Sequence, residues 1–252
     1  MNLDEVAAQL LRDYDAKTPG TVFEDATFTT PEAYEIQAKV SVLRQQRGES
    51  VIGYKVGCVS PALRESMGIF HPVFGRLYDT EQWQSDTRLE PASFATPAIE
   101  GELAVHLKAN LTVDSLSELT ILDAIDSVFV VIEMHNKVFR GSPSAPELIA
   151  NNAIHAGVVH ASGKATSLPK APGPLSVIID DEEVAKVAGQ DLRTTIIESL
   201  AWLTKELEQQ NETLRAGQTI LCGTISGMHL IEPGTHVQVT TEDFGTVNMR
   251  LG

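Results

Sequence analysis

The apolar positions of the first fifty residues recur at helical spacing. Leu3, Val6, Ala7, Leu10 and Leu11 form one stripe, and the pattern stops before the helix-breaking run Thr18-Pro19-Gly20. A second helix is predicted to begin at Thr30-Pro31, where a capping threonine precedes a proline, and to end near Gly48. We therefore expect residues 1–50 to form a helical N-terminal arm.

From Val51 onward the pattern changes to short apolar runs separated by Gly, Pro, Asn and Asp, which is typical of β-structure. The expected strands are Val51–Val59, Ile99–Lys108, Val128–His135, Gly157–His160, Leu175–Ile179, Thr219–Gly223, Thr235–Thr240 and Gly245–Leu251. Two helices are expected among them, a short one over Ser117–Ile125 and a longer one with an apolar face from Leu192 to Leu207. The sequence has no internal repeat and no long linker, so residues 51–252 are predicted to form one β-rich domain and the chain an α+β fold.

Composition narrows the functions that this fold could serve. The chain has 252 residues and a formal net charge of −15, with 34 acidic residues against 19 basic ones. Nucleic acids and anionic membranes are poor partners for such a chain, because phosphates are neutralised by Lys and Arg. No stretch approaches the roughly 20 apolar residues of a membrane span. Two cysteines and an acidic N-terminus without the features of a signal peptide favour the reducing cytoplasm.

The run IEGELAVHL contains two acids that share one face of a strand. Side chains alternate in a strand, so Glu100 and Glu102 project side by side and repel each other. A third acid, Glu133, follows five apolar residues. It either lies at the strand end, where it reaches solvent or an arginine, or it joins Glu100 and Glu102 in one site. Together the three carboxylates would form an all-oxygen site for Mg²⁺ or Mn²⁺ that leaves coordination positions for water and a chelating substrate.

Lys55 lies between Gly53 and Gly57 on one face of the expected strand VIGYKVGCVS. Glycine inside a strand weakens it unless another group approaches closely, so this lysine has open space beside it. It is either a surface lysine on an edge strand, an ammonium beside a bound anion, or a proton donor and acceptor with a lowered pKa. His106 and His135 share a face with the acids and either support the metal ligands or form ordinary half-buried hydrogen bonds.

The order of these motifs resembles the fumarylacetoacetate hydrolase superfamily. GYKVG, FGRLYD at Phe74–Asp79, IEGEL and the lone Glu133 follow one another as in that family, most closely in its branch of 2-keto-4-pentenoate hydratases and 2-oxohex-3-enedioate decarboxylases. The similarity continues through NNAIHAG, LAWL and AGQTILCGTISG, and covers nearly the whole chain. It implies a mixed β-roll of the fumarylacetoacetase C-terminal type, with short helices, that assembles into homo-oligomers.

The resemblance also implies roles for particular residues. The implied site consists of Glu100, Glu102 and Glu133 for the metal, Lys55 and, as a weaker candidate, Asp79 for acid–base catalysis, and Gly57, Asn152 and Thr224 for substrate contacts. Glutamate at position 133, where many carbon–carbon hydrolases have aspartate, favours the lyases. The expected activity is a metal-dependent hydratase of a small 2-hydroxy-dienoic or 2-oxo acid.

Two departures from the family pattern keep other activities open. The stretch Asn151–His155 has isoleucine where hydratases commonly have a serine near the substrate. The His–Glu pair with which the hydrolase branch activates water has no counterpart before the paired acids. The alternatives are a 2-oxo-enedioate decarboxylase, an acylpyruvate-type carbon–carbon hydrolase, and a non-catalytic paralogue, which the four retained residues Lys55, Glu100, Glu102 and Glu133 disfavour.

Overall fold

The N-terminal arm consists of helices, as its hydrophobic pattern predicts. The computed structural model describes residues 2–138, 140–161 and 167–252, and its first elements are α1 (Leu3–Ala16), α2 (Val22–Asp25) and α3 (Thr30–Gln46). The cap of α3 is Thr29 and not Thr30, because the hydroxyl of Thr29 accepts from the amide of Glu32 while the Glu32 carboxylate accepts from the amide of Thr29 at 2.8 Å.

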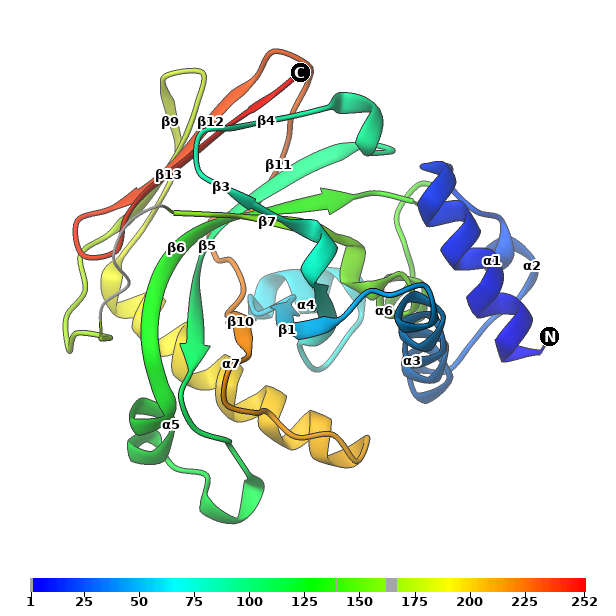
Figure 1. The fold of residues 1–252 in the computed structure, drawn as a ribbon, viewed down its shortest axis with the longest axis horizontal. Coiled ribbons are helices and arrows are strands. Elements are labelled where there is room, and N and C mark those ends of the chain that lie inside the picture. Colours follow the sequence, from blue (N-terminus) through cyan, green and yellow to red (C-terminus); the bar gives the residue numbers. More distant parts are fainter. Residues whose placement is uncertain (1, 139, 162–166) are drawn as a thin grey trace.

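The larger sheet carries the strands that form the candidate site. Its strands are β1 (Val51–Gly57), β2 (Val73–Tyr78), β3 (Gln82–Gln84), β5 (Pro97–Leu107), β6 (Ile125–Asn136), β7 (His155–His160), β10 (Thr219–Leu221) and β11 (Met228–Leu230). They are ordered β2-β1-β10-β5-β6-β7-β3, and β11 pairs with β5. The sheet curls strongly, so that β5 and β6 wrap around one side of the molecule (Figure 1).

The smaller sheet covers the outer face of the larger one. Its order is β4-β13-β12-β8-β9, with β4 at Thr87–Leu89, β8 at Leu175–Ile179, β9 at Glu182–Val187, β12 at His236–Thr241 and β13 at Gly245–Leu251. A Cβ on Gly101 of β5 would lie 2.6 Å from Val177 and 2.9 Å from Val239, so this face of β5 packs directly on the smaller sheet. Because side chains alternate, Glu100 and Glu102 point to the opposite face, into the curl.

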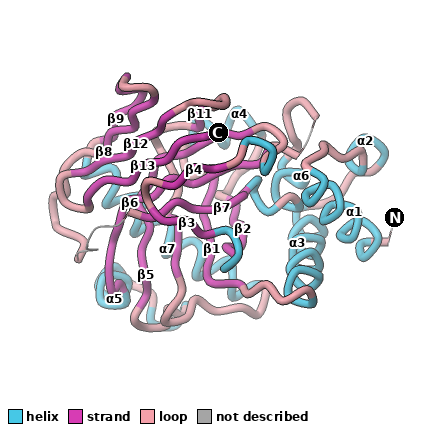
Figure 2. The backbone as a smooth tube through the Cα atoms, turned by 45° about the horizontal axis from the view of Figure 1, so that its top comes forward, coloured by secondary structure: helices cyan, strands magenta, loops and turns pink. Residues whose placement is uncertain are grey.

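The remaining helices are α4 (Pro61–Met67), α5 (Glu118–Ala124), α6 (Ala145–Ala150) and α7 (Gly189–Gln209). Figure 2 places α1, α3 and α6 together on one side of the sheets. Val6, Ala33 and Ile36 of the arm belong to the same buried core as Val56 and Ile132 of the strands. In the described part of the chain, no helix has the length and apolar character needed to cross a membrane.

All eight strands and both internal helices expected from the sequence are present, with ends shifted by up to three residues. The pattern missed β2, β3, β4, β9 and β11. Three of these have three residues each, too short to reveal a period, and β2 is buried along its whole length despite containing Gly75 and Arg76. Of the acidic run at residues 180–183, Asp180 and Asp181 form the turn between β8 and β9 in the left-handed conformation, and Glu182 and Glu183 begin β9.

Candidate active site

Three acids converge inside the curl of the larger sheet. Glu100 of β5 and Glu133 of β6 are directly paired across the two strands, and Glu102 lies two residues along the same face. Glu102 and Glu133 are fully buried, whereas the Glu100 side chain is 14% exposed. The acids predicted from the sequence thus come together, and Glu100 is the member through which solvent reaches them.

Lys55 faces these acids from β1. Its Nζ lies 3.3 Å from Oε1 of Glu133 and donates to the carbonyl of Ala153 at 3.4 Å. The residue is 2% exposed, and β1 lies between β2 and β10 in the sheet, so Lys55 is not a surface lysine on an edge strand.

The glycines on either side of Lys55 serve different purposes. A Cβ on Gly57 would lie 3.2 Å from the lysine Nζ, so this glycine leaves space for the ammonium. A Cβ on Gly53 would lie 1.8 Å from the carbonyl oxygen of Thr219, so this glycine allows β10 to pair with β1. Only Gly57 therefore bears on the candidate site.

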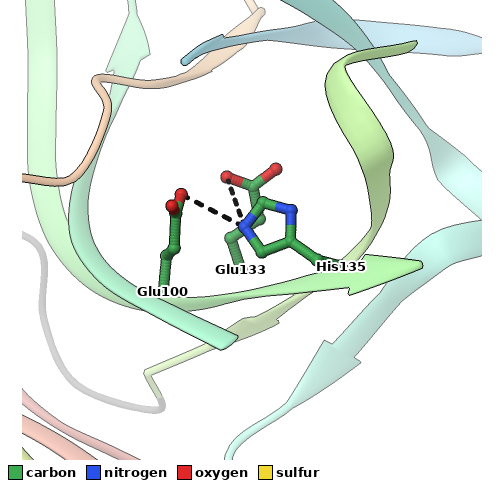
Figure 3. A group of neighbouring side chains, drawn as sticks. All are labelled: Glu100, Glu133 and His135. Carbon is green, nitrogen blue, oxygen red and sulfur yellow. Dashed lines mark ion pairs between the residues drawn. The ribbon is translucent and has the colours of Figure 1, made fainter. Parts of the chain in front are cut away.

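Two buried histidines contact the acids (Figure 3 draws one of them, His135). Nδ1 of His155 lies 2.7 Å from Oε1 of Glu133. Nε2 of His135 lies 3.1 Å from Oε2 of Glu100 and 3.8 Å from Oε2 of Glu133. His106, in contrast, meets the hydroxyl of Thr219 at 3.4 Å, which fits the reading of an ordinary polar contact. Sequence reasoning missed His155, whose only signal was its position at the start of the strand that pairs with β6.

The charges of the acids and Lys55 are strongly coupled. Burial, together with the neighbouring carboxylates Glu133 and Glu100, raises the pKa of Glu102 well above its ordinary value. Burial acts in the same direction on Glu133, but the Lys55 ammonium and the two histidines outweigh it and hold the pKa of Glu133 well below its usual range. Burial would lower the pKa of Lys55, and the three carboxylates outweigh it and raise that pKa. Lys55 is therefore a charged ammonium in the free protein and not a base with a lowered pKa.

The donor set fits a divalent cation. Oε1 of Glu102 and Oε2 of Glu133 are buried and have no hydrogen-bond partner among the described residues, which is costly for carboxylate oxygens. Ligand atoms of Glu100, Glu133 and His135 all lie within 4.8 Å of one another. Oε2 of Glu102 accepts from the amide of Gly223 at 2.5 Å, which leaves its other oxygen available. A hard cation would satisfy these free oxygens.

The other residues implied by the family resemblance differ in how close they lie to the three acids. Asp79 follows β2 and accepts from the amide of Ser50 at 2.9 Å. Lys55 pairs with Gly75, and Asp79 lies four residues farther along the chain, roughly 13 Å along the strand from the lysine backbone. The structure therefore does not bring Asp79 to the acids. Thr224 donates to the carbonyl of Gly101, directly between the paired acids in sequence, at 3.0 Å.

Asn152 opens a left-handed turn behind Lys55. Asn152, Ala153 and Ile154 have φ values of 56°, 49° and 55°, a conformation that is costly for a β-branched residue. The amide side chain of Asn152 bonds both the N–H and the C=O of Arg76 at 2.7 and 2.9 Å, which fixes the turn to β2. The turn directs the Ala153 carbonyl to Lys55 and delivers His155 to Glu133. Asn152 thus acts on the site through the backbone of this turn.

A cavity of about 460 Å³ lies elsewhere, between the helical arm and the loops after β2. Its charged lining is internally paired: Arg44 contacts Glu49 and Glu81, and Tyr14 donates to Glu81 at 2.6 Å. It contains none of the three acids and not Lys55. Size alone does not make this cavity the active site, and we assign the chemistry to the acids.

Comparison with known proteins identifies the family of the chain. Residues 83–251 match the family described as fumarylacetoacetate (FAA) hydrolase C-terminal, and the chain belongs to this family. The described fold, with its curled sheets and its helices at the N-terminus, confirms the predicted fold class, an α+β fold with a mixed β-roll.

Similar proteins extend the match over nearly the whole chain. A 2-keto-4-pentenoate hydratase of Paraburkholderia xenovorans (strain LB400) is 25% identical over 96% of this chain and 93% of its own length. A 4-oxalocrotonate decarboxylase of a Pseudomonas species is 26% identical over 92% of this chain and 90% of its own length. The solved 4-oxalocrotonate decarboxylase of Pseudomonas putida G7, complexed with magnesium and adipate, superimposes with a TM-score of 0.90 at 23% identity, covering 100% of this chain and 99% of that chain.

Proposed function

We propose that the protein is a divalent-metal-dependent hydratase acting on a small 2-hydroxy-dienoic or 2-oxo acid, of the 2-keto-4-pentenoate hydratase type. The observation that carries this proposal is the convergence of Glu100, Glu102 and Glu133 on a buried ammonium, with carboxylate oxygens that lack partners. The hydratase relatives, which align over almost the full chain, support it.

Glu100, Glu102 and Glu133 would hold Mg²⁺ or Mn²⁺. When bound, the ion would supply Lewis-acid stabilisation of the negative charge that develops on the C2 oxygen of the substrate. Glu100, as the partly exposed acid, lies on the side from which a substrate would enter. Solved relatives carry divalent ions: one 4-oxalocrotonate decarboxylase holds magnesium, and a fumarylpyruvate hydrolase of Pseudomonas aeruginosa holds Mn²⁺.

Lys55 would carry the proton transfers. The 2-hydroxyl of the dienol loses its proton and C5 gains one, which converts the dienol into a conjugated 2-oxo acid. Water then adds its hydroxyl to C4 and a proton to C3. Lys55 enters this sequence protonated, so it would first donate its proton to C5, and the neutral amine would then accept the proton that the 2-hydroxyl loses. In the addition of water it would again donate a proton, to C3, and accept one from the water. Gly57 leaves room beside Nζ for the substrate carbon chain, and Thr224 lies next to Glu100 and Glu102 as a candidate substrate contact. Asp79 remains a weaker candidate because of its distance from Lys55.

A decarboxylase is the second candidate function. The relatives and the solved structures named 4-oxalocrotonate decarboxylase match the chain over the same extent as the hydratases. The same enolate would form when the bond to a distal carboxylate breaks, the electron pair moves toward C2 and CO₂ leaves. An acylpyruvate hydrolase finds less support, because no His–Glu pair precedes the acids in the sequence.

One assay distinguishes these reactions. Purified protein with Mg²⁺ or Mn²⁺ is given 2-hydroxypenta-2,4-dienoate, 2-oxohex-3-enedioate and an acylpyruvate, and the loss of ultraviolet absorbance and the products are followed. Turnover of the first by addition of water is the expected result. Turnover of only 2-oxohex-3-enedioate, with release of CO₂, would identify a decarboxylase in place of a hydratase. Cleavage of only the acylpyruvate would favour the hydrolase. Turnover of none would support a non-catalytic paralogue.

We further propose a homo-oligomer in the cytoplasm. Exposed apolar side chains, among them Phe70 at 89% and Leu230 at 62%, offer surface that a second copy would cover. Cys58 and Cys222 are both free thiols, as expected in a reducing compartment. Light scattering on the purified protein tests the assembly, and a monomer at micromolar concentration would refute it. Cell fractionation tests the location.

A further inference from the structure

His135 is a buried imidazole whose position is not explained by hydrogen bonding. The residue is 1% exposed, and neither Nδ1 nor Nε2 has a hydrogen-bond partner among the described residues. Buried polar side chains are normally satisfied, so an imidazole with two unpartnered nitrogens requires an explanation. Its contact with Glu100 is short, at 3.1 Å, but it lacks the alignment of a hydrogen bond.

The separations in this cluster are those of atoms that share one ion. In an octahedron with metal–ligand bonds of about 2.1 Å, neighbouring ligand atoms lie about 3.0 Å apart. Nε2 of His135 lies 3.1 Å from Oε2 of Glu100 and 3.8 Å from Oε2 of Glu133, and the Glu133 oxygen also lacks a hydrogen-bond partner. Figure 3 shows this nitrogen directed at the space between the two carboxylates.

The strands hold His135 at this position. It lies two residues after Glu133, so both side chains project from the same face of β6. On the neighbouring strand β5 it is paired with Ala98, whose small side chain leaves room for the imidazole ring. The pairing of β6 with β7 shifts its register between Met134 and His135. As a result, His135 is paired with His155 of β7.

We propose that Nε2 of His135 is a direct ligand of the divalent metal, together with Glu100 and Glu133. This inference rests on the proposed metal site and adds a nitrogen to its three carboxylates. Magnesium prefers oxygen ligands, whereas imidazole suits transition metals. The site therefore selects Mn²⁺, or another first-row transition metal ion, over Mg²⁺ more strongly than three carboxylates alone would.

Pulsed electron paramagnetic resonance on the Mn²⁺-loaded protein tests the ligand directly. A directly bound imidazole nitrogen modulates the electron spin echo, and labelling the histidines with ¹⁵N changes the modulation frequencies. We expect this nitrogen signal in the wild-type protein and in His155→Gln, and its loss in both His135→Phe and His135→Asn. Binding of Mn²⁺ without a nitrogen signal in the wild-type protein would overturn the proposal and leave the carboxylate site standing.

A signal that survives in His135→Phe but disappears in His155→Gln would also overturn it, because it would identify the wrong histidine. No binding of Mn²⁺ at all would refute the metal site itself, a result distinct from the other two. Calorimetry with Mn²⁺ and Mg²⁺ measures the selectivity. The ratio of the two affinities should fall by roughly tenfold in His135→Phe, and an unchanged ratio would contradict a bound nitrogen. The wild-type spectrum decides the central question even if one variant does not fold.

Discussion

The substitution Glu102→Gln tests the charge distribution of the site in the metal-free protein. Glu102 is buried beside Glu133, and burial with these neighbouring carboxylates raises its pKa. In the unfolded chain the same carboxyl has an ordinary pKa near 4.5. Glutamine reproduces the protonated acid: its carbonyl can accept from the amide of Gly223, and its amide can donate to Glu133.

The size of the effect follows from proton linkage. Above about pH 4.5 the unfolded chain has lost the Glu102 proton while the folded protein keeps it, so stability falls as pH rises toward the raised pKa. Each pH unit in this window costs the wild-type protein about 1.4 kcal/mol for one retained proton. Glu133 has a lowered pKa and is ionised in both states there, so it adds no slope. Between pH 5 and pH 7 the free energy of unfolding should therefore fall more in the wild-type protein than in Glu102→Gln, by at most about 1.4 kcal/mol for each pH unit that lies below the raised pKa.

Urea unfolding in the presence of a chelator, at pH 5, 6 and 7 and at one protein concentration, measures the difference between the two proteins. The control is Glu208→Gln, an exposed change on α7, whose curve should run parallel to the wild type. The reasoning is refuted if Glu102→Gln also runs parallel to the wild type. A Glu102→Gln protein that is less stable at every pH would mean that the ionised Glu102 has a structural partner.

Three further predictions concern the site and the strand that carries Lys55. Divalent metal at about 100 times its dissociation constant should raise the free energy of unfolding by roughly 2.7 kcal/mol, and equal melting temperatures with no metal uptake would refute the carboxylate site. Lys55→Met should lower kcat on the accepted substrate by roughly 10²–10⁴-fold, the range for loss of a general acid or base, with a smaller effect on metal affinity. Oxalate, which offers two chelating oxygens, serves as a substrate analogue. If its affinity falls steeply in Lys55→Met while kcat is retained, Lys55 neutralises the negative charge of the site and does not transfer protons. Gly53→Ala should destabilise the protein by about 1–3 kcal/mol because of the Thr219 backbone. A Cβ on Gly57 would lie 3.2 Å from the flexible end of Lys55 and at ordinary contact distance, 3.4 Å, from Val73, so Gly57→Ala should affect kcat more than melting temperature.

Much of the site could be predicted because its residues follow strand periodicity. Glu100 and Glu102 share a face by alternation, and Glu133 stands out as the one charge after a buried run. Their convergence also needed the pairing of β5 with β6, which the hydrophobic pattern alone does not specify. The family resemblance supplied the shared metal-binding role of the three acids, and the register of Glu100 opposite Glu133 agrees with it.

The parts that could not be predicted depend on contacts between distant segments. His155 reaches Glu133 through a left-handed turn at residues 152–154, and no local rule assigns that conformation to an isoleucine. Gly53 and Gly57 look alike in the sequence, yet one faces the backbone of β10 and the other faces a side chain. The pKa of Lys55 was open in either direction, because its sign depends on whether burial or the carboxylates prevail.

The charges of the free protein explain how the site can accept a cation and then an anion. In formal charges, Glu100, Glu133 and the Lys55 ammonium sum to −1 when Glu102 is protonated, and this negative charge attracts a divalent ion. Binding through all three carboxylates requires Glu102 to lose its proton, and the site with its ion then sums to zero. A neutral site does not repel a substrate carboxylate, and the ammonium remains protonated beside it. Metal affinity should consequently rise with pH up to the raised pKa of Glu102, because the cation and this proton compete for the same oxygen.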